Sequence, residues 1–283
     1  MSGPRAALSA LRPAHWLKNA PILAGLVFGG RIADGIAVRS VGLTFAAFCL
    51  VASAGYLVND VVDRDQDRAH PLRGRRAVAA GALSKRAACL LAAVLALCGG
   101  ALVLGAPPGA QACLATYAAL TSAYTFLLRR VPMLASLAVA AGFVLRALAG
   151  AEAAAVPPSP WLLSLTGVLA LALAVSKREA EARRRDGVAA CALVRTTDAL
   201  LLASALGYLA YGFSPDTVAI HATRWLPLTA LPVLLALARY RSRLRASREG
   251  LGPAEIVARD PMLLVLGVVW AVLSVVVLRM GAR

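Results

Sequence analysis

The chain has 283 residues, of which 60% are hydrophobic and only 16% are charged, and its formal net charge is +16 at pH 7. A soluble domain carries about a quarter of charged residues, so this composition excludes a soluble protein. Apolar runs of membrane-spanning length alternate with short charged stretches, which predicts an all-α integral membrane protein.

Nine apolar runs predict nine transmembrane helices, the first of them interrupted by Arg31 and Asp34 and the seventh and eighth short. The longest connecting segments all fall on one face of the membrane, so a single transmembrane domain over residues 1–283 with one site on that face is expected. No cleavable signal peptide is expected, because the start lacks a long apolar region. The predicted spans cover residues 19–38, 41–58, 87–105, 109–128, 133–151, 159–176, 198–213, 224–238 and 261–279.

The distribution of the basic residues predicts the orientation. If the N-terminus is cytoplasmic, the outer segments hold only five of the 30 Lys and Arg residues, and Arg146 lies inside a span. Positive residues gather on the cytoplasmic side of cell-membrane proteins. The pattern therefore favours a multi-pass plasma-membrane protein that meets membrane lipids and anionic substrates, and it argues against nucleic acid as a partner. The five outer residues are Arg31, Arg39, Arg224, Arg279 and Arg283.

An acidic cluster follows the second predicted span. Asn59, Asp63 and Asp67 recur every four residues, and Asp60 precedes Asp63 by three, so on a helix these side chains share one face. Oxygen ligands on one face at a membrane edge suit Mg²⁺ that carries a substrate phosphate. Asp65 points to the opposite side and is expected to be solvated.

Arginines follow the acids within ten residues. Arg73 and Arg76 can bind phosphate oxygens that the metal leaves free. The alternative is an ordinary charged loop in which these acids and bases pair with one another.

Further candidate residues for substrate binding lie near the other span ends. Lys18 follows the interfacial Trp16, and Arg129 lies in the connection between the fourth and fifth spans, where it can also be only a topology signal. Arg146 lies deep in the fifth span, where a charge normally faces a polar cavity or a partner, unless the span is shorter and the side chain snorkels outward. The remaining candidates are Tyr124, Lys177, Arg178 and Glu181.

These stretches together resemble the UbiA superfamily of intramembrane transferases, nearly from end to end. The pattern of Asn59, Asp60, Asp63 and Asp67 is similar to the first aspartate motif of that superfamily. More narrowly, the chain resembles the decaprenyl-phosphate phosphoribosyltransferase branch. That narrower likeness is carried by Arg12, Pro13, Trp16, Lys18 and Asn19, by Arg68, His70, Pro71, Arg73 and Arg76, by Tyr124 and Arg129, by Arg146 and Gly150, by Lys177, Arg178 and Glu181, and by Gly252, Glu255 and Asp260.

The resemblance implies nine helices around a central cavity open to the cytoplasm, and Mg²⁺-dependent transfer with pyrophosphate leaving. The aromatic-prenylating branches carry a second Asp-rich motif after span six, where this chain has Lys177, Arg178 and Glu181. The chain departs from the phosphoribosyl branch in having Arg129 at a Lys position and Ala135 at an Asp position.

The leading interpretation is transfer of phosphoribose from phosphoribosyl pyrophosphate to a polyprenyl phosphate. Asp60, Asp63 and Asp67 are then the catalytic acids that hold Mg²⁺, assisted by Asn59. A second interpretation is a prenyltransferase that moves a polyprenyl group from its diphosphate to an aromatic or other acceptor. A third is a transporter or lipid-binding membrane protein without catalysis.

Overall fold

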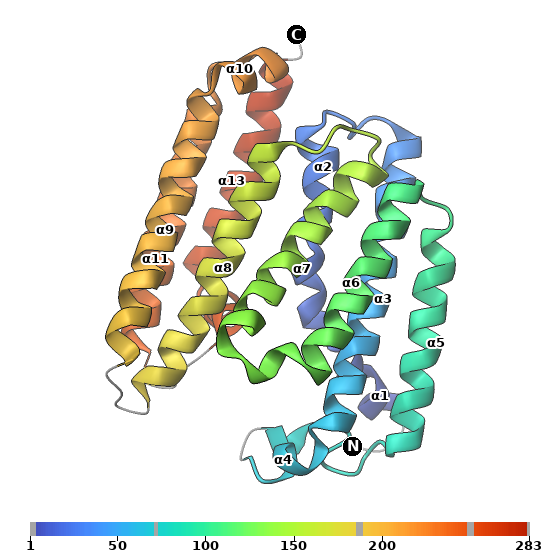
Figure 1. The fold of residues 1–283 in the computed structure, drawn as a ribbon. Helices are drawn as coiled ribbons and strands as arrows, with labels where there is room; N and C mark the ends of the chain where they lie inside the picture. Colours follow the sequence, from blue (N-terminus) through green and yellow to red (C-terminus); the bar gives the residue numbers. More distant parts are fainter. Residues whose placement is uncertain (1–3, 71–72, 185–188, 248–251, 282–283) are drawn as a thin grey trace. The chain divides into compact units, whose positions relative to one another are not determined.

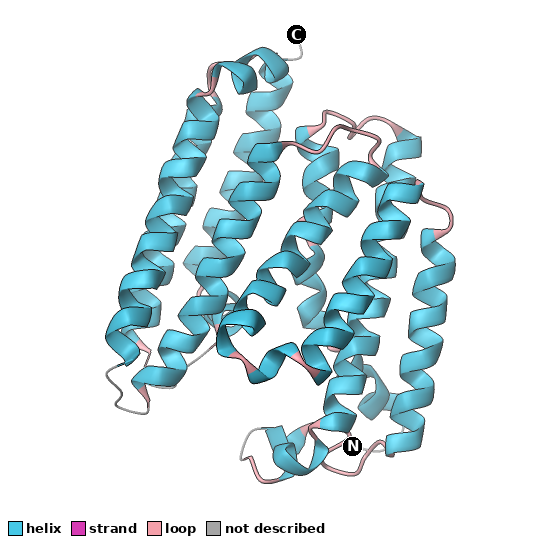
Figure 2. Ribbon diagram, viewed as in Figure 1, coloured by secondary structure: helices cyan, strands magenta, loops and turns pink. Residues whose placement is uncertain are grey.

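The computed structural model describes residues 4–70, 73–184, 189–247 and 252–281. Within these residues the chain forms helices joined by loops and turns, without a strand (Figure 2). It divides into two compact units, unit 1 over Met1–Pro158 and unit 2 over Ser159–Arg283.

Unit 1 is built around a long helix, α3, which packs along α5 and also contacts α6 and α7 (Figure 1). Asp34 caps the start of α3, where its carboxylate accepts hydrogen bonds from the amides of Ile36 and Ala37. Phe48 and Leu57 of α3 are fully buried. The helices of unit 1 are α1 (Pro4–Leu11), η1 (Pro13–Asn19), α2 (Ile22–Phe28), α3 (Gly35–Val62), α4 (Arg64–Arg68), η2 (Arg73–Arg75), α5 (Lys85–Val103), α6 (Pro108–Phe126), η3 (Leu128–Arg130) and α7 (Pro132–Ala153).

The N-terminal part of unit 1 differs from the prediction of one span over residues 19–38. The structure has the seven-residue α2, then a turn, and α3 already begins at Gly35. Gly30 in the turn has φ +67, which glycine adopts without strain, and Arg31 pairs with Asp34 at 2.7 Å. The chain therefore breaks at the residues that interrupt the apolar run.

Helices α2 and α7 cross with their backbones almost in contact. A Cβ atom on Gly25 would lie 2.6 Å from the amide nitrogen of Ala151, and one on Gly150 would overlap the carbonyl oxygen of Ile22. Small residues allow such close helix crossings in membranes. This crossing anchors the N-terminal segment to α7.

Unit 2 pairs α8 with α9 and α11 with α13. Its core includes Tyr240, Leu244, Ile256 and Leu263. The helices are α8 (Pro160–Arg183), α9 (Ala189–Phe213), α10 (Pro215–His221), η4 (Leu226–Thr229), α11 (Ala230–Ala246), α12 (Pro253–Arg259) and α13 (Pro261–Gly281).

The described residues contain six helices long and apolar enough to cross a membrane, namely α3, α5, α7, α8, α9 and α13. A seventh is counted if α10 and the segment Leu226–Ala246, which meet at a bend of 101°, form one broken span. Helix α6 has 19 residues but is not among them, because Gln111 and several Thr, Ser and Tyr residues lower its hydropathy. The all-helical, multi-pass class is confirmed, and this criterion identifies fewer spans than the predicted nine.

Candidate active site

The acidic cluster lies where α3 gives way to α4. Helix α3 ends at Val62, and Asp63 has φ −90 and ψ 5, so the regular helix breaks there. The backbone bonds of a helix nevertheless continue across the break, since the amide of Asp63 donates to Asn59 and that of Asp67 donates to Asp63, both at 2.8 Å. The four-residue spacing therefore survives a change of helix. Asp60 and Asp67 are buried, Asn59 and Asp63 are half-buried, and Asp65 is exposed as predicted.

Three arginines from three separate segments pair with the acids. Arg12 Nη2 donates to Asp60 Oδ1 at 2.5 Å, and Arg129 Nη1 donates to Asp63 Oδ1 at 2.5 Å. Arg12 precedes η1, whereas Arg129 belongs to η3. The fold thus brings two distant parts of the chain to the C-terminal end of α3.

Arg76, just after η2, joins the two buried acids. Its Nη1 lies 2.7 Å from Asp67 Oδ2 and 3.3 Å from Asp60 Oδ1. Arg73 lies farther away, with Nη1 3.9 Å from Asp67 Oδ1. Both arginines predicted beside the acids are therefore there, and the closer one is a direct partner of two carboxylates.

Tyr56, one turn before Asp60 in α3, organises the N-terminal cations. The Arg12 guanidinium carbon lies 5.0 Å from the centre of the Tyr56 ring, and Lys18 Nζ lies 5.9 Å from it. Arg12 has φ 51, the left-handed region that is unfavourable for a side chain with a Cβ, so its packing and ion pair must offset that cost. The sequence analysis named Arg12 only as part of a family motif. It did not single out Tyr56, because this residue lies within an apolar run where an aromatic side chain gives no signal of its own.

Arg146 is buried in α7 and does not snorkel. It donates from Nε to Asn19 Oδ1 at 2.6 Å, from Nη1 to the Gly142 carbonyl at 2.7 Å and from Nη2 to the Tyr117 hydroxyl at 2.8 Å. Asn19 in turn donates to Cys49 Sγ at 3.1 Å. Arg146 therefore ties α7, α6 and α3 to the segment that carries Lys18.

The chemistry of the acidic cluster fits a divalent cation only in part. The donors are all oxygens, and the buried Asp67 Oδ1 has no hydrogen-bond partner. However, no three His, Cys, Asp or Glu side chains in the described ranges are grouped to hold one metal ion. The donor set is suitable, but in this state guanidinium groups engage its carboxylates.

For the remaining predicted residues, the described structure shows no ion pair with the acidic cluster. Tyr124 is half-buried in α6. Lys177, Arg178 and Glu181 belong to α8 in unit 2, where both basic groups lie 3.9 Å from the Glu181 carboxylate. Ala135, at the position where the resembling branch has Asp, is buried in α7. Pro71 of the quoted motif lies outside the described residues.

A second charged cluster, which sequence reasoning missed, lies inside unit 2. The fully buried Glu179 accepts two hydrogen bonds from Arg241 Nη1, at 2.7 and 2.8 Å, and pairs with Arg183 at 2.7 Å. Arg241 also lies 2.5 Å from Asp198. Because Glu179 and Glu181 stand in one charged run, the sequence carries no signal that distinguishes the buried acid from the half-exposed one.

Asp260 caps the start of α13, as Asp34 caps the start of α3. Its carboxylate accepts from the amides of Met262 and Leu263 and lies 3.0 Å from both Arg239 and Arg243. Burial acts to raise the pKa of Asp260, but the Leu263 amide and the two guanidiniums outweigh it and lower the pKa.

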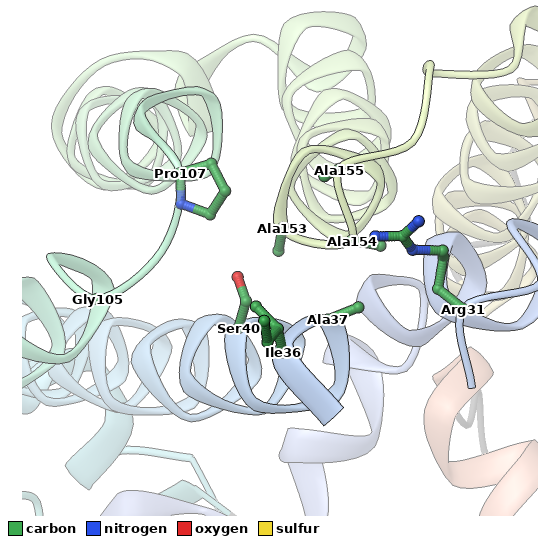
Figure 3. A pocket seen from close by; sticks show the side chains of 9 residues that line it. All are labelled: Arg31, Ile36, Ala37, Ser40, Gly105, Pro107, Ala153, Ala154 and Ala155. Carbon is green, nitrogen blue, oxygen red and sulfur yellow. The ribbon is translucent and has the colours of Figure 1, made fainter. Parts of the chain in front are cut away.

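A pocket of about 270 Å³ lies at the other end of unit 1 (Figure 3). Its lining includes Ser40, near the start of α3, and Ala153, at the end of α7. Ser40 is twenty residues from Asp60 along one helix, a separation of roughly 30 Å. This pocket is therefore remote from the acidic cluster.

An all-helical, multi-pass fold with a buried acid–arginine cluster at the end of a long helix defines the class of the protein. The chain matches the UbiA prenyltransferase family over residues 19–255. It belongs to that family and is a transferase.

Curated relatives show which branch of the family the chain is similar to. The chain is 33% identical to a decaprenyl-phosphate phosphoribosyltransferase of Corynebacterium glutamicum, over 93% of this chain and 83% of the relative. It is 31% identical to the protein of the same name in Mycolicibacterium smegmatis, over 93% of this chain and 89% of that one.

The fold agrees with solved structures. A UbiA homolog from Archaeoglobus fulgidus bound to GPP and Mg²⁺ superposes with a TM-score of 0.74, covering 98% of this chain and 99% of that chain, at 16% identity. At this identity the likeness shows the fold alone.

Proposed function

We propose that the chain transfers the phosphoribosyl group of phosphoribosyl pyrophosphate to a polyprenyl phosphate and releases pyrophosphate. The observation that carries the proposal is the cluster in which Arg12, Arg76 and Arg129 meet Asp60, Asp63 and Asp67 at one end of α3. Fixed acids beside several guanidiniums suit a diphosphate that carries a divalent cation. The names of the relatives supply the transferred phosphoribosyl group and the polyprenyl-phosphate acceptor.

The reaction requires little proton chemistry from the protein. A phosphate oxygen of the polyprenyl phosphate attacks the anomeric carbon of the ribose, and the bond from that carbon to the pyrophosphate oxygen breaks with its electron pair on pyrophosphate. The acceptor phosphate is already an anion near neutral pH, so no strong general base is needed. The chain's own contribution is to orient the two substrates and to place positive charge at the leaving group.

Different residues would bind the metal ion and the two phosphorylated substrates. Asp60, Asp63 and Asp67, with Asn59, would hold Mg²⁺, which when bound neutralises charge on the leaving pyrophosphate. Arg73, Arg76 and Lys18 bind oxygens of the diphosphate. The candidates for the second phosphate are Arg129 in unit 1 and, from the sequence, Lys177 and Arg178 in unit 2. Tyr124 and Glu181 are further candidates for substrate binding, and Arg146 braces the N-terminal segment.

The membrane arrangement is part of the same proposal. Nine crossing segments result if the N-terminal segment through α2, helix α6 and the bent α10–α11 pair each count as one crossing in addition to the six long helices. With the N-terminus cytoplasmic, α3 then ends on the cytoplasmic side, and the cavity that receives the substrates opens there. The protein would work in the plasma membrane.

The second candidate function is prenyl transfer from a polyprenyl diphosphate to an aromatic acceptor, which the family description favours. Both functions use the acidic cluster. They differ in the segment at the end of α8, where the basic Lys177 and Arg178 stand in place of a second acidic motif. Fixed positive charge suits a second phosphorylated substrate better than a second metal does.

The test uses purified full-length protein in detergent with labelled phosphoribosyl pyrophosphate, Mg²⁺ and polyprenyl phosphate. We expect labelled lipid to form, to require Mg²⁺, and to fall at least about 100-fold in Asp63→Ala, because removing a group that stabilises leaving-group charge costs rates on this scale. The matched control is Asp65→Ala, since Asp65 is 80% exposed and two residues away.

Two results would contradict the proposal. Prenylated product from a polyprenyl diphosphate and an aromatic acceptor, with none from phosphoribosyl pyrophosphate, would establish the second function. Binding of polyprenyl phosphate without any product from either donor would support the non-catalytic interpretation.

A further inference from the structure

The acidic cluster is already neutralised by the protein itself. Each of its three carboxylates has a guanidinium within 2.5–2.7 Å, and the three guanidiniums belong to three segments of unit 1. Buried carboxylates are costly without a counter-ion. Arg12, Arg76 and Arg129 therefore supply, in this state, the positive charge that a divalent cation would bring.

The two partners of this cluster differ in their freedom to move. In each pair the carboxylate is less exposed than its guanidinium. The exposed fractions are 3% for Asp60 and 19% for Arg12, 1% for Asp67 and 32% for Arg76, and 21% for Asp63 and 30% for Arg129. Arginine has a long side chain with several rotatable bonds, and aspartate has a short one. The acids are thus the fixed part of the cluster and the arginines the exchangeable part.

A cation alone would gain little from this arrangement. To reach Asp60 Oδ1 and Asp67 Oδ2 it would have to approach Arg76 Nη1, which bridges these two oxygens at 3.3 and 2.7 Å, and like charges at such distances repel. Displaced guanidiniums would then need new anions. A diphosphate offers several oxygens at once, so its arrival with the cation satisfies both the acids and the arginines.

We propose that Arg12, Arg76 and Arg129 are exchangeable counter-ions of Asp60, Asp63 and Asp67, so that a divalent cation binds weakly alone and binds strongly together with a diphosphate. The inference rests on the part of the proposed function that assigns a cation–diphosphate pair to this cluster, and not on the identity of the sugar or the lipid. Coupling of this kind is reciprocal: the cation raises the affinity for the diphosphate by the same factor.

The experiment measures binding by equilibrium dialysis of the full-length protein in detergent. Mn²⁺ is the cation probe and methylenediphosphonate is the diphosphate probe, each added alone and both added together. The protein-free chamber reports the complex that the two probes form in solution. We expect the wild-type protein to bind Mn²⁺ at least about tenfold more tightly in the presence of the diphosphate, which corresponds to a coupling of about 1.4 kcal/mol.

Arg76→Gln tests the exchange directly. We expect this variant to bind Mn²⁺ alone at least about tenfold more tightly than the wild type and to lose most of the coupling, because one guanidinium no longer bridges the two buried acids. Arg75→Gln is the matched control, since Arg75 is exposed and makes no ion pair with the acids in the described structure, and it should behave as the wild type. Adding Asp67→Asn to Arg76→Gln should abolish the gain in Mn²⁺ binding.

The proposal is overturned if wild-type protein binds Mn²⁺ equally well with and without the diphosphate, or if Arg76→Gln leaves Mn²⁺ binding unchanged. Should Arg76→Gln unfold, Arg129→Gln provides the same test at Asp63, which is less buried. Failure of phosphoribosyl transfer with coupling retained would contradict only the proposed function, because neither probe contains a ribose or a lipid. Transfer retained without coupling would contradict only the exchange of counter-ions.

Discussion

Arg146 shows how one residue can be both costly and structural in a membrane helix. A charge at this depth is expensive unless it meets polar partners. Here three donors of one guanidinium meet Asn19, Gly142 and Tyr117, and the group also stacks over the Tyr117 ring at 4.3 Å. The residue thus acts by positioning the N-terminal segment, and no contact with a substrate is needed to explain it.

At this scale we predict that Arg146→Leu lowers the free energy of unfolding by about 3 kcal/mol, because it leaves the buried polar groups of Asn19 and Tyr117 unpaired. Arg146→Lys should recover part of the loss, since an ammonium keeps the charge but cannot reach all three acceptors at once. The measurement is thermal or denaturant unfolding in detergent. Arg39→Leu, at an exposed site on α3, is the control, and equal losses in both variants would refute the bracing role.

Among the elements, the crossing of α2 and α7 decides where the N-terminal segment lies. The contact depends on Gly25 and Gly150, whose missing side chains let the two backbones meet. The same segment carries Arg12 and Lys18 toward Tyr56. A helix packing contact formed by two glycines is therefore coupled to the cations beside the acidic cluster.

We predict that Gly150→Ala destabilises the protein by about 1–3 kcal/mol, the usual cost of overpacking a tight contact. Gly100→Ala in α5 is the control, because a Cβ at that position meets no atom within 4 Å and should be neutral or slightly stabilising. Unfolding midpoints of the two variants in one detergent make the comparison. A stable Gly150→Ala protein would show that the two helices do not cross as described.

On the scale of the whole molecule, the distribution of charge and the position of the acids together predict a fixed orientation in the membrane. The acids end α3, whereas Asp34 and the pocket of Figure 3 lie near its start. With 28 residues, α3 has a length of roughly 42 Å, enough to separate its ends across a bilayer. The two ends should therefore face different compartments.

We predict opposite accessibility for two single cysteines placed in a version of the protein whose five native cysteines are replaced by alanine. Asp65→Cys should react with a membrane-impermeant maleimide only in inside-out vesicles, and Arg224→Cys only in right-side-out vesicles, since both positions are exposed. Detergent-solubilised protein, in which both should react, is the control. Labelling of Asp65→Cys from outside would reverse the proposed orientation.

Much of the site was predictable because its signals are local. Composition and apolar runs determined the membrane class, and the spacing of Asn59, Asp60, Asp63 and Asp67 located the acidic cluster at the end of a helix. Arg73 and Arg76 were expected near the acids because they follow within ten residues. Boundaries were less predictable: an apolar run does not reveal where a turn such as that at Gly30 divides it.

The sequence by itself determined an all-helical membrane protein in which acids and then arginines follow a long apolar run, because hydropathy and short-range spacing depend only on neighbours along the chain. Its class as a transferase came from the likeness of its motifs to a known family. Tertiary structure alone decided which arginine meets which acid. Arg12 and Arg129 lie 48 and 66 residues from their partners, a separation that no local pattern encodes. It also decided that Glu179 is buried while Glu181 stays half-exposed, since burial depends on packing between helices and not on residue type.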